Sequence, residues 1–416
     1  MSSPADYTRL RTTPRSRRHV ICSVAGMLTC IAIVAATLAV TFVGATLPTP
    51  LYPLYRHAFG FGTVTLALIY ASYVLGNLLA LLVFGRVSDQ VGRRRVILPA
   101  IACAFVSTLA FAFATNPAWL FVARSLSGLG TGVVSGAATA WIAEILGASR
   151  KRTATSWAVG ANFLGLAAGP LLAGLLAQTA PWPLRLAYIV YLPVLVVIAL
   201  LLRSAPETVA KPVRNLRDLS LRPRFGVPAG IRARFVSPAV AAFATFALVG
   251  FYAALIPSLL AESLHVKAPL AAAGVVFELF VVAAVATGLT ARLSPRDALL
   301  IGLALLIPSV GLLVAAQVRS SMPLLLTATA LGGISGALGY RGSLEIINKI
   351  APDDRRSEVV SSYLVTVYSG NALPVIGVGV LSTFVGSVTA DIAFAALIAV
   401  LGISAWAVGF KYIPQG

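Results

Sequence analysis

The chain has 416 residues, 58% of them hydrophobic and only 11% charged, and its mean hydropathy is +0.91. About a quarter of the residues of a soluble domain are charged, so this composition excludes an ordinary soluble protein and indicates a membrane protein. The formal net charge of +19 would favour a nucleic-acid partner in a soluble protein, but here the basic residues lie mostly in loops between apolar segments. That distribution favours a role in membrane topology and excludes nucleic acid as the partner.

Twelve uninterrupted apolar segments are long enough to cross a bilayer, which takes roughly 20 residues. They are continuous and rich in Leu, Ala, Val and Gly, whereas the strands of a β-barrel alternate between polar and apolar residues. The predicted spans are residues 20–46, 62–84, 96–115, 117–145, 153–178, 183–203, 236–260, 270–291, 297–317, 322–347, 358–385 and 388–410. The expected fold is therefore an all-α membrane protein with twelve transmembrane helices.

Basic residues are distributed unequally between the two sides of the membrane. Of the 32 Lys and Arg, 26 lie in the N-terminal tail, in alternate loops, or after the last span, and four lie on the other side. The positive-inside rule then predicts a multi-pass protein of a bacterial plasma membrane with both termini in the cytoplasm. The basic tail could also be read as the start of a signal peptide, but the apolar run is too long and eleven further spans follow.

The longest hydrophilic break divides the spans six and six. The predicted organisation is a basic cytoplasmic tail (1–19), an N-terminal six-helix bundle (20–203), a cytoplasmic linker (204–235) and a C-terminal six-helix bundle (236–411). A shift of 204 residues superposes Gly128 on Gly332, Gly132 on Gly336, Arg152 on Arg356 and Pro170 on Pro374. We therefore expect the two bundles to be pseudo-symmetric products of a duplication.

The turn after the second span carries the most informative motif. It reads Gly85-Arg-Val-Ser-Asp89-Gln-Val-Gly92-Arg93-Arg94-Arg95. Gly85 and Gly92 supply the backbone freedom of a short reversal, Asp89 stands where a helix end can be capped, and the arginines hold the turn in the cytoplasm. This pattern resembles the signature loop of the major facilitator superfamily of secondary transporters, and the position after the second span also matches.

The resemblance has consequences for architecture and mechanism. It implies two parallel six-span halves with a substrate site between them near the midplane. It also implies that Gly85, Asp89, Gly92, Arg93 and Arg94 form a conformational latch, in which Asp89 contacts the start of span 11 in the outward-facing state. The alternative is that this loop only sets the topology. The second half lacks both glycines at the equivalent turn, and span 6 ends in a Pro-Glu-Thr sequence (206–208) similar to that of many members.

Span 4 contains Arg124 about seven residues from its external end, which is roughly 10 Å at 1.5 Å per residue. Burying an arginine in a span costs at least about 2.5 kcal/mol, so we expect Arg124 to have a partner and a function. The stretch resembles the superfamily's arginine-bearing motif of this span, which is implicated in proton transfer, although Ser127 replaces the usual glutamine. The alternative is that Arg124 snorkels to the external interface.

Span 5 contains a run of small residues around a proline. Gly165, Gly169, Pro170 and Gly174 allow close helix approach and a bend. The run is similar to the Gly-Pro motif of bacterial drug:proton antiporters in the superfamily, a group that the chain resembles together with the predicted sugar-efflux permeases. Ordinary small-residue packing is the alternative.

Glu278 lies close to the midpoint of span 8 among aliphatic and aromatic residues. Desolvation disfavours the ionised form of such a lone carboxylate, which is the condition for loading and releasing a proton during transport. The sequence therefore predicts a coupling role for Glu278 and a position facing the cavity between the bundles. Recognition of a cationic substrate and a hydrogen-bonded packing role remain alternatives.

Several further polar residues are candidates for the cavity or a gate. Arg341 and Glu345 of span 10 are one helical turn apart and can neutralise each other, as a latch or as a structural pair. Asn77 in span 2, Asn162 in span 5, and Tyr363, Tyr368 and Asn371 in span 11 complete this group.

No nucleotide-binding motif or catalytic constellation is discernible, and the three cysteines have no ligand-like spacing. We therefore expect no enzyme, no metal and no cofactor, with a proton gradient as the energy source. The predicted function is alternating-access efflux of small amphipathic compounds by a functional monomer in exchange for protons. The alternatives are a symporter or facilitator that imports a sugar, amino acid or organic acid, and a non-transporting receptor or scaffold on the same fold.

Overall fold

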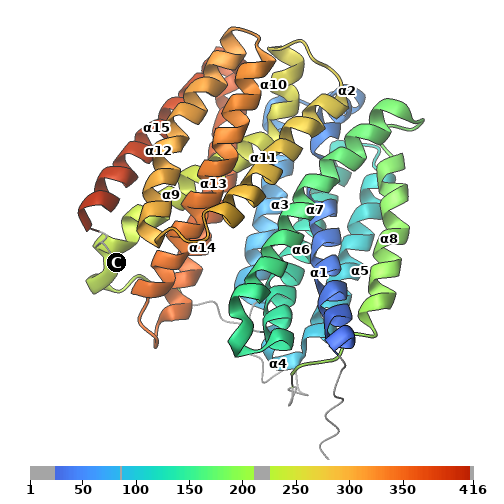
Figure 1. Cartoon of the computed structure of the whole chain (residues 1–416). Coiled ribbons are helices and arrows are strands. Elements are labelled where there is room, and N and C mark those ends of the chain that lie inside the picture. Colours follow the sequence, from blue (N-terminus) through green and yellow to red (C-terminus); the bar gives the residue numbers. More distant parts are fainter. Residues whose placement is uncertain (1–23, 85–86, 210–224, 413–416) are drawn as a thin grey trace, which may run out of the picture.

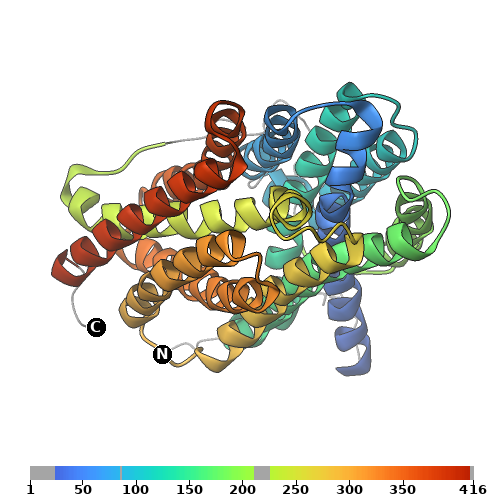
Figure 2. The ribbon, with the colours of Figure 1, turned by 90° about the horizontal axis from the view of Figure 1, so that it is seen from above.

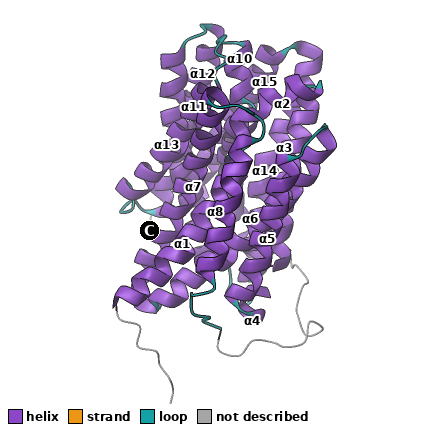
Figure 3. Ribbon diagram, turned by 90° about the vertical axis from the view of Figure 1, so that its right-hand side faces the viewer, coloured by secondary structure: helices purple, strands orange, loops and turns teal. Residues whose placement is uncertain are grey.

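The computed structural model describes residues 24–84, 87–209 and 225–412. The predicted tail (1–19), Gly85 and the middle of the predicted linker lie outside these residues. The described chain is helical and contains no strand (Figure 3). Its long helices are α1 (Val24–Thr46), α3 (Thr63–Phe84), α5 (Arg93–Ala112), α6 (Pro117–Leu146), α7 (Lys151–Thr179), α8 (Leu186–Leu202), α9 (Arg232–Ala254), α11 (Pro269–Leu289), α12 (Pro295–Val318), α13 (Met322–Ile350), α14 (Arg356–Val385) and α15 (Ser387–Tyr412).

These twelve helices confirm the predicted fold class. Eleven of them are long and apolar enough to cross a membrane, and α8 is a shorter apolar helix of 17 residues. Seventeen residues are at the lower limit of what spans a bilayer, so α8 completes the set. The helices begin and end close to their predicted spans, except that the predicted span 236–260 is divided into α9, which ends at Ala254, and the separate short helix Ile256–Glu262.

Short helices occupy the turns at both ends of the long ones. They are η1 (Thr49–Leu51), α2 (Tyr52–Phe59), α4 (Val87–Val91), η2 (Ala148–Arg150), η4 (Ala229–Ile231) and α10 (Ile256–Glu262). Prolines begin three of them: Pro50, Pro53 and Pro257 stand in the first turns of η1, α2 and α10. Proline is tolerated there because its missing N–H has no helical partner anyway. The prolines after α1 thus end one helix and start the next.

The long helices form two bundles. The first contains α1, α3 and α5 to α8, and the second contains α9 and α11 to α15 (Figures 1 and 2). The bundles meet along two seams, in which α7 packs against α11 and α3 packs against α14. The 204-residue shift relates α6 to α13 and α7 to α14 nearly residue for residue, and both α7 and α14 contain a proline, Pro170 and Pro374.

The molecule has two unlike ends. We call the end that carries α4, η2 and the start of α14 the basic end, and the end that carries α2 and α10 the opposite end. In Figure 1 the bundles come together at the opposite end, drawn at the top, and separate toward the basic end. The α2 and α10 helices of the two bundles contact each other directly.

Candidate functional site: a buried arginine beside the seam

Arg124 is completely enclosed within the first bundle. The α6 helix carries it, and only 1% of its surface is exposed. This burial excludes the alternative that Arg124 snorkels to the interface.

Tyrosines and one carbonyl group satisfy the guanidinium. Nε donates to the Tyr52 hydroxyl at 2.8 Å, Nη2 donates to the same oxygen, and Nη1 donates to the Ala45 carbonyl at 2.6 Å. The rings of Tyr52, Tyr70 and Tyr73 lie 5.3, 6.0 and 5.3 Å from the guanidinium carbon. Cation–π contacts of this kind stabilise a desolvated cation by about 2 kcal/mol. Among the described residues no carboxylate pairs with Arg124, so its charge is solvated by dipoles and is not neutralised.

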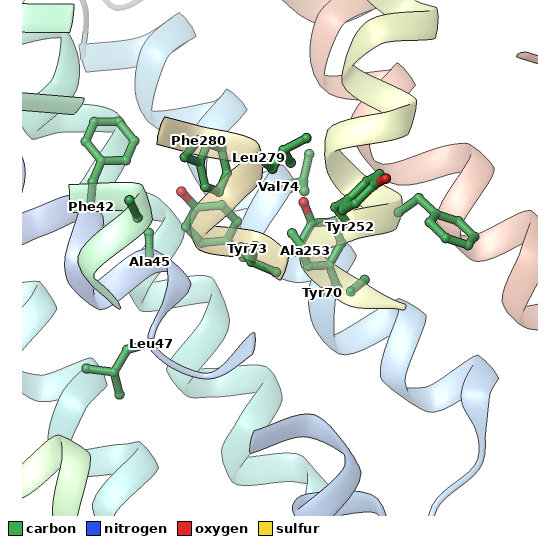
Figure 4. Packing of buried hydrophobic residues seen from close by; sticks show 14 of the residues in the cluster. Phe42, Ala45, Leu47, Tyr70, Tyr73, Val74, Tyr252, Ala253, Leu279 and Phe280 are labelled. Atoms are coloured by element: carbon green, nitrogen blue, oxygen red, sulfur yellow. The ribbon is translucent and has the colours of Figure 1, made fainter. Parts of the chain in front are cut away.

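We call Tyr52, Tyr70 and Tyr73 the tyrosine cage. One of them, Tyr70, also lies in the seam between α3 and α14. The Tyr70 hydroxyl, on α3, donates a hydrogen bond of 2.8 Å to Oδ1 of Asn371 on α14. Both residues are buried. Figure 4 shows Tyr70 and Tyr73 of the first bundle in the same cluster as Tyr252, Leu279 and Phe280 of the second. The predicted candidate Asn371 therefore connects the bundles next to Arg124.

Close helix packing fixes the cage. Asn77 donates to the Tyr73 hydroxyl at 3.4 Å, while its own Oδ1 is buried without a hydrogen-bond partner. A Cβ added at Gly128 would lie 2.1 Å from the Tyr73 carbonyl oxygen, and one added at Gly132 would lie 2.6 Å from that of Asn77. Only glycine allows α6 to approach α3 this closely, so these glycines hold the tyrosines against Arg124.

Glu278 lies on α11 between a packed face and an exposed face. Its neighbours Leu279 and Phe280 are buried, whereas Phe277 and Val281 are 36% and 37% exposed. Glu278 itself is half-buried, and its Oε2 atom is buried without a hydrogen-bond partner. An ionised carboxylate is costly in such a place. Glu278 lines neither described cavity, so its predicted position facing the inter-bundle cavity and its coupling role both stay predictions.

The small residues of α7 make close contacts on two sides. A Cβ at Gly165 would lie 2.2 Å from the Ala39 carbonyl oxygen of α1, and one at Gly169 would lie 2.3 Å from Thr46. A Cβ at Gly174 would lie 2.6 Å from Ala273 of α11, in the other bundle. The run that includes the buried Pro170 therefore packs α7 against α1 and against the second bundle. The antiporter role that the resemblance implies for this run stays a prediction.

Arg341 and Glu345, two further candidates of the second bundle, lie near the end of α11. Arg341 donates to the carbonyl oxygens of Thr290 and Leu293 at 2.6 and 2.9 Å, and its Nε lies 3.5 Å from exposed Glu345. It thus binds the C-terminal end of α11, where a cation is favourable, and pairs only loosely with Glu345.

Tyr368 belongs to an aromatic group with Phe246 and Tyr340, at ring distances of 6.4 Å for Tyr368–Phe246 and 5.0 Å for Phe246–Tyr340. Tyr363 is fully buried and bonded to Ser343, which indicates packing. Asn162 is half-buried on α7 and takes no part in either cluster.

The predicted latch residues form a network inside the first bundle. Arg93 is buried, pairs with Asp89 and donates a hydrogen bond of 2.6 Å to Ser88. It also donates to Glu144 of α6 through Nη2 at 2.5 Å and through Nε at 3.3 Å. Arg94 donates to the Arg203 carbonyl at 2.9 Å. The resemblance implied that Asp89 contacts the start of α14, and this structure does not have that contact. The bundles are apart at this end, and Asp89 pairs with Arg93 instead.

The cap of α5 comes from Glu207, whereas the sequence had assigned a capping position to Asp89. The backbone N–H groups of Arg93 and Arg94 donate to the two Glu207 carboxylate oxygens at 2.8 and 3.1 Å. A carboxylate at a helix N-terminus neutralises the positive end of the dipole. Gly92 has φ = +116°, and a Cβ there would lie 2.8 Å from Glu207. Glycine is therefore required at position 92 by both conformation and space.

The opposite end contains an ion pair that the sequence did not predict. Arg56 of α2 donates to Glu262 of α10 at 3.0 Å and to Ser258 at 3.2 Å, joining the two bundles. Close by in the second bundle, Gln317 donates to buried Asp391 at 2.8 Å. Sequence offered no signal for the ion pair, because its partners are 206 residues apart. The tyrosine cage did have a signal in the sequence, because Tyr70, Tyr73 and Asn77 are spaced so that they share one helical face.

The comparisons with known proteins agree with this architecture. A family model described as Major Facilitator Superfamily matches residues 29–315. A solved bacterial homolog of the human lysosomal transporter Spinster, in an inward-facing and unoccupied conformation, has a TM-score of 0.73 at 16% identity, covering 94% of this chain and 100% of that one. At that identity the likeness shows the fold alone.

Curated relatives match parts of the chain. An uncharacterized MFS-type transporter of Mycobacterium tuberculosis is 28% identical over 219 residues, which are 52% of this chain and 31% of the relative. The class B tetracycline resistance protein of Escherichia coli is 37% identical over 98 residues, 23% of this chain and 24% of the relative. A cephamycin export protein of Amycolatopsis lactamdurans is 31% identical over 131 residues, 31% of this chain and 27% of the relative. Each match covers less than a third of the relative's own length.

Proposed function

Because the chain belongs to the Major Facilitator Superfamily and is therefore a membrane transporter, we propose that it exports small amphipathic compounds in exchange for protons. Export is supported by relatives whose names describe tetracycline resistance, cephamycin export and efflux. The charge distribution of the loops supports a bacterial plasma membrane with the basic end in the cytoplasm. The proton gradient supplies the energy, with no cofactor, and the monomer is the working unit.

The unneutralised charge of Arg124, beside the seam between α3 and α14, supports proton-coupled export most directly. A buried cation held only by tyrosine dipoles and a carbonyl group responds strongly to any charge that arrives or leaves nearby. Tyr70 belongs both to the cage around Arg124 and to the hydrogen bond with Asn371 across the bundles. A change in charge near Arg124 is thereby linked to the contact that must break when the bundles rock. Glu278 is the group we assign to proton exchange.

An amphipathic substrate fits the polarity of the interior. Lone charges in the middle of the spans are restricted to Arg124 and Glu278 among the described residues. Aromatic rings from both bundles, among them Tyr70, Tyr73, Tyr252 and Phe280, lie in one buried cluster. Aromatic side chains offer a large apolar surface with a polar tip, which suits compounds with a greasy body and few charges. A zwitterion such as an amino acid would require a pair of fixed charges close together.

The test is proton release from energised everted vesicles, followed with a pH-gradient dye on addition of lipophilic cations, antibiotics, sugars or amino acids. Amphipathic drugs should release protons, and Glu278→Gln should abolish the release while the protein still folds. Glu345→Gln is the matched control, since Glu345 is exposed at the basic end, and it should behave like the parent protein. Release that persists in Glu278→Gln would exclude Glu278 as the coupling group.

A second function is favoured by one observation. Arg124 has no carboxylate partner among the described residues, so an organic anion could supply one, as in a symporter or facilitator for an organic acid. In the same assay, such a protein would respond to organic acids and not to lipophilic cations. Arg124→Lys would then weaken the response, because lysine lacks the planar fork that binds a carboxylate with two hydrogen bonds.

A further inference from the structure

A groove of about 680 Å³ runs between α1 and α7 in the half of the first bundle near the basic end. Small residues form most of its wall. The lining residues are Ala32, Ala35, Ala36, Ala39, Thr153, Ser156, Trp157, Gly160, Ala161 and Leu164. This groove lies outside the tyrosine cage and shares no residue with the latch network.

The groove opens toward the membrane and not toward the seam. Trp157, Leu164 and Leu175 lie on one stripe of α7, because separations of 7 and 11 residues return to the same helical face. They are 39%, 65% and 48% exposed. An exposed apolar stripe on a spanning helix meets lipid, whereas α7 meets α11 through another face at Gly174. Figure 3 looks onto the outer side of the first bundle, where α1, α7 and α8 lie side by side.

The depth of the groove corresponds to one leaflet. Thr153 and Leu164 are 11 positions apart, or about 16 Å of helix, and one leaflet of the hydrocarbon core is about 15 Å deep. The groove closes in mid-membrane, where Gly165 and Gly169 bring α7 against α1. Between that point and the basic end the helices are less closely packed, and a Cβ added at Gly160 would meet no atom within 4 Å. The shape therefore suits a single acyl chain.

The mouth of the groove is basic. The sequence Arg150-Lys151-Arg152 directly precedes Thr153 at the start of α7, and Arg150 is exposed. Clusters of basic residues next to a spanning helix attract anionic headgroups by about 1 kcal/mol per residue near the surface. A headgroup at this mouth would meet the positive charge of exposed Arg150 at the start of α7.

We propose that this groove binds an anionic phospholipid of the leaflet at the basic end, with one acyl chain between α1 and α7 and its phosphate near Arg150. Leaflet depth and apolar walls select the chain, and the basic mouth selects the charge of the headgroup. The site does not depend on the direction or coupling of transport.

Trp157 provides a direct probe of the occupant. Trp119, Trp182 and Trp406 are exposed and are replaced by Phe, while fully buried Trp141 is retained as a background that lipid cannot reach. The protein is reconstituted in zwitterionic vesicles that contain a small fraction of brominated phosphatidylglycerol or brominated phosphatidylcholine. We expect the anionic lipid to quench Trp157 with about fivefold higher apparent affinity, the effect of one basic residue near the surface.

Two variants separate the chain site from the headgroup site. Gly160→Leu projects into the groove and should abolish the preference, whereas Gly311→Leu should retain it, because Gly311 is also an exposed helical glycine with no atom near an added Cβ. Replacing Arg150, Lys151 and Arg152 together by Gln should leave equal quenching by both lipids. Size-exclusion profiles verify that each variant is folded.

Three results would overturn the proposal. Equal quenching by the two lipids in the parent protein would mean that the groove is merely bathed in bulk lipid. The same preference in Gly160→Leu as in Gly311→Leu would place the anionic lipid elsewhere. Relief of quenching by a transported drug at low concentration would identify the substrate, and not a lipid, as the occupant.

Discussion

The two ends of the molecule use their charged residues in opposite ways. At the opposite end, Arg56 and Glu262 join one bundle to the other, and their side chains are 24% and 43% exposed. At the basic end, the charged groups hold each bundle together internally: Arg93, Glu144 and Glu207 in the first bundle, and Arg341 in the second. Exposed ion pairs contribute at most about 1 kcal/mol, whereas hydrogen bonds to buried charged groups contribute about 1.5 to 3 kcal/mol.

The proposed export by alternating access would use this difference. The weak ion pair between the bundles would break in each cycle, while strong contacts within each bundle would keep it rigid. The two internal joints also have opposite chemistry. In the first bundle, Glu207 binds the N–H groups at the start of α5, and in the second, Arg341 binds the carbonyl groups at the end of α11. Each charge has the sign that its helix end favours. Both bundles are thus stabilised by a charged side chain at a helix end, although the residues and the ends differ.

The largest loss of stability should come from Arg93→Gln. The substitution leaves Asp89 and Glu144 without their cation, so we expect a loss of about 2 kcal/mol in stability. SDS-induced unfolding in mixed micelles measures this loss. A double-mutant cycle with Glu144→Gln should show that the two losses are coupled. Additive losses would mean that Arg93 and Glu144 do not act as a pair.

The contact between Arg341 and the end of α11 should contribute less stability than the contacts of Arg93. Arg341→Gln removes the guanidinium from two carbonyl groups at the end of α11, and we expect a loss of about 1 kcal/mol. The same unfolding measurement applies, with Glu345→Gln as the control, because Glu345 is only loosely paired. If Glu345→Gln cost as much as Arg341→Gln, the ion pair and not the helix end would be the important contact.

Glu207→Gln tests the cap alone. The glutamine keeps an oxygen for one backbone N–H but loses the negative charge at the start of α5, so we expect a loss of about 0.5 kcal/mol. The loss should shrink at high salt, because salt screens exposed charges. A loss independent of salt would indicate that Glu207 acts through packing.

The smallest effect on stability, and the clearest on conformation, should come from Arg56→Gln. We expect less than about 0.5 kcal/mol of destabilisation but about a twofold increase in the open population of the opposite end, since this pair joins the bundles. Spin labels on α2 and α10 report the distance distribution. Exchanging the charges with Arg56→Glu and Glu262→Arg should restore the parent distribution, and failure to restore it would mean that the pair does not hold this end.

The sequence predicted the fold well because the signal for a span is local. Twenty apolar residues bounded by Gly, Pro or Arg define a helix without reference to the rest of the chain. The turns were predicted less completely, since Asp89 was expected to cap a helix that Glu207 caps from 114 residues away. The same limit applies to the site. Arg124 was found from its charge, but its partner Tyr52 lies 72 residues away and only folding brings them together.

Export driven by a proton gradient can be measured with purified protein in proteoliposomes. An imposed pH gradient, acidic inside, is applied without any initial substrate gradient, and accumulation of a labelled amphipathic drug is followed. We expect uphill accumulation that collapses with a protonophore, disappears in Glu278→Gln and persists in Glu345→Gln. Accumulation that ignores the pH gradient, or that Glu278→Gln leaves unchanged, would contradict this expectation.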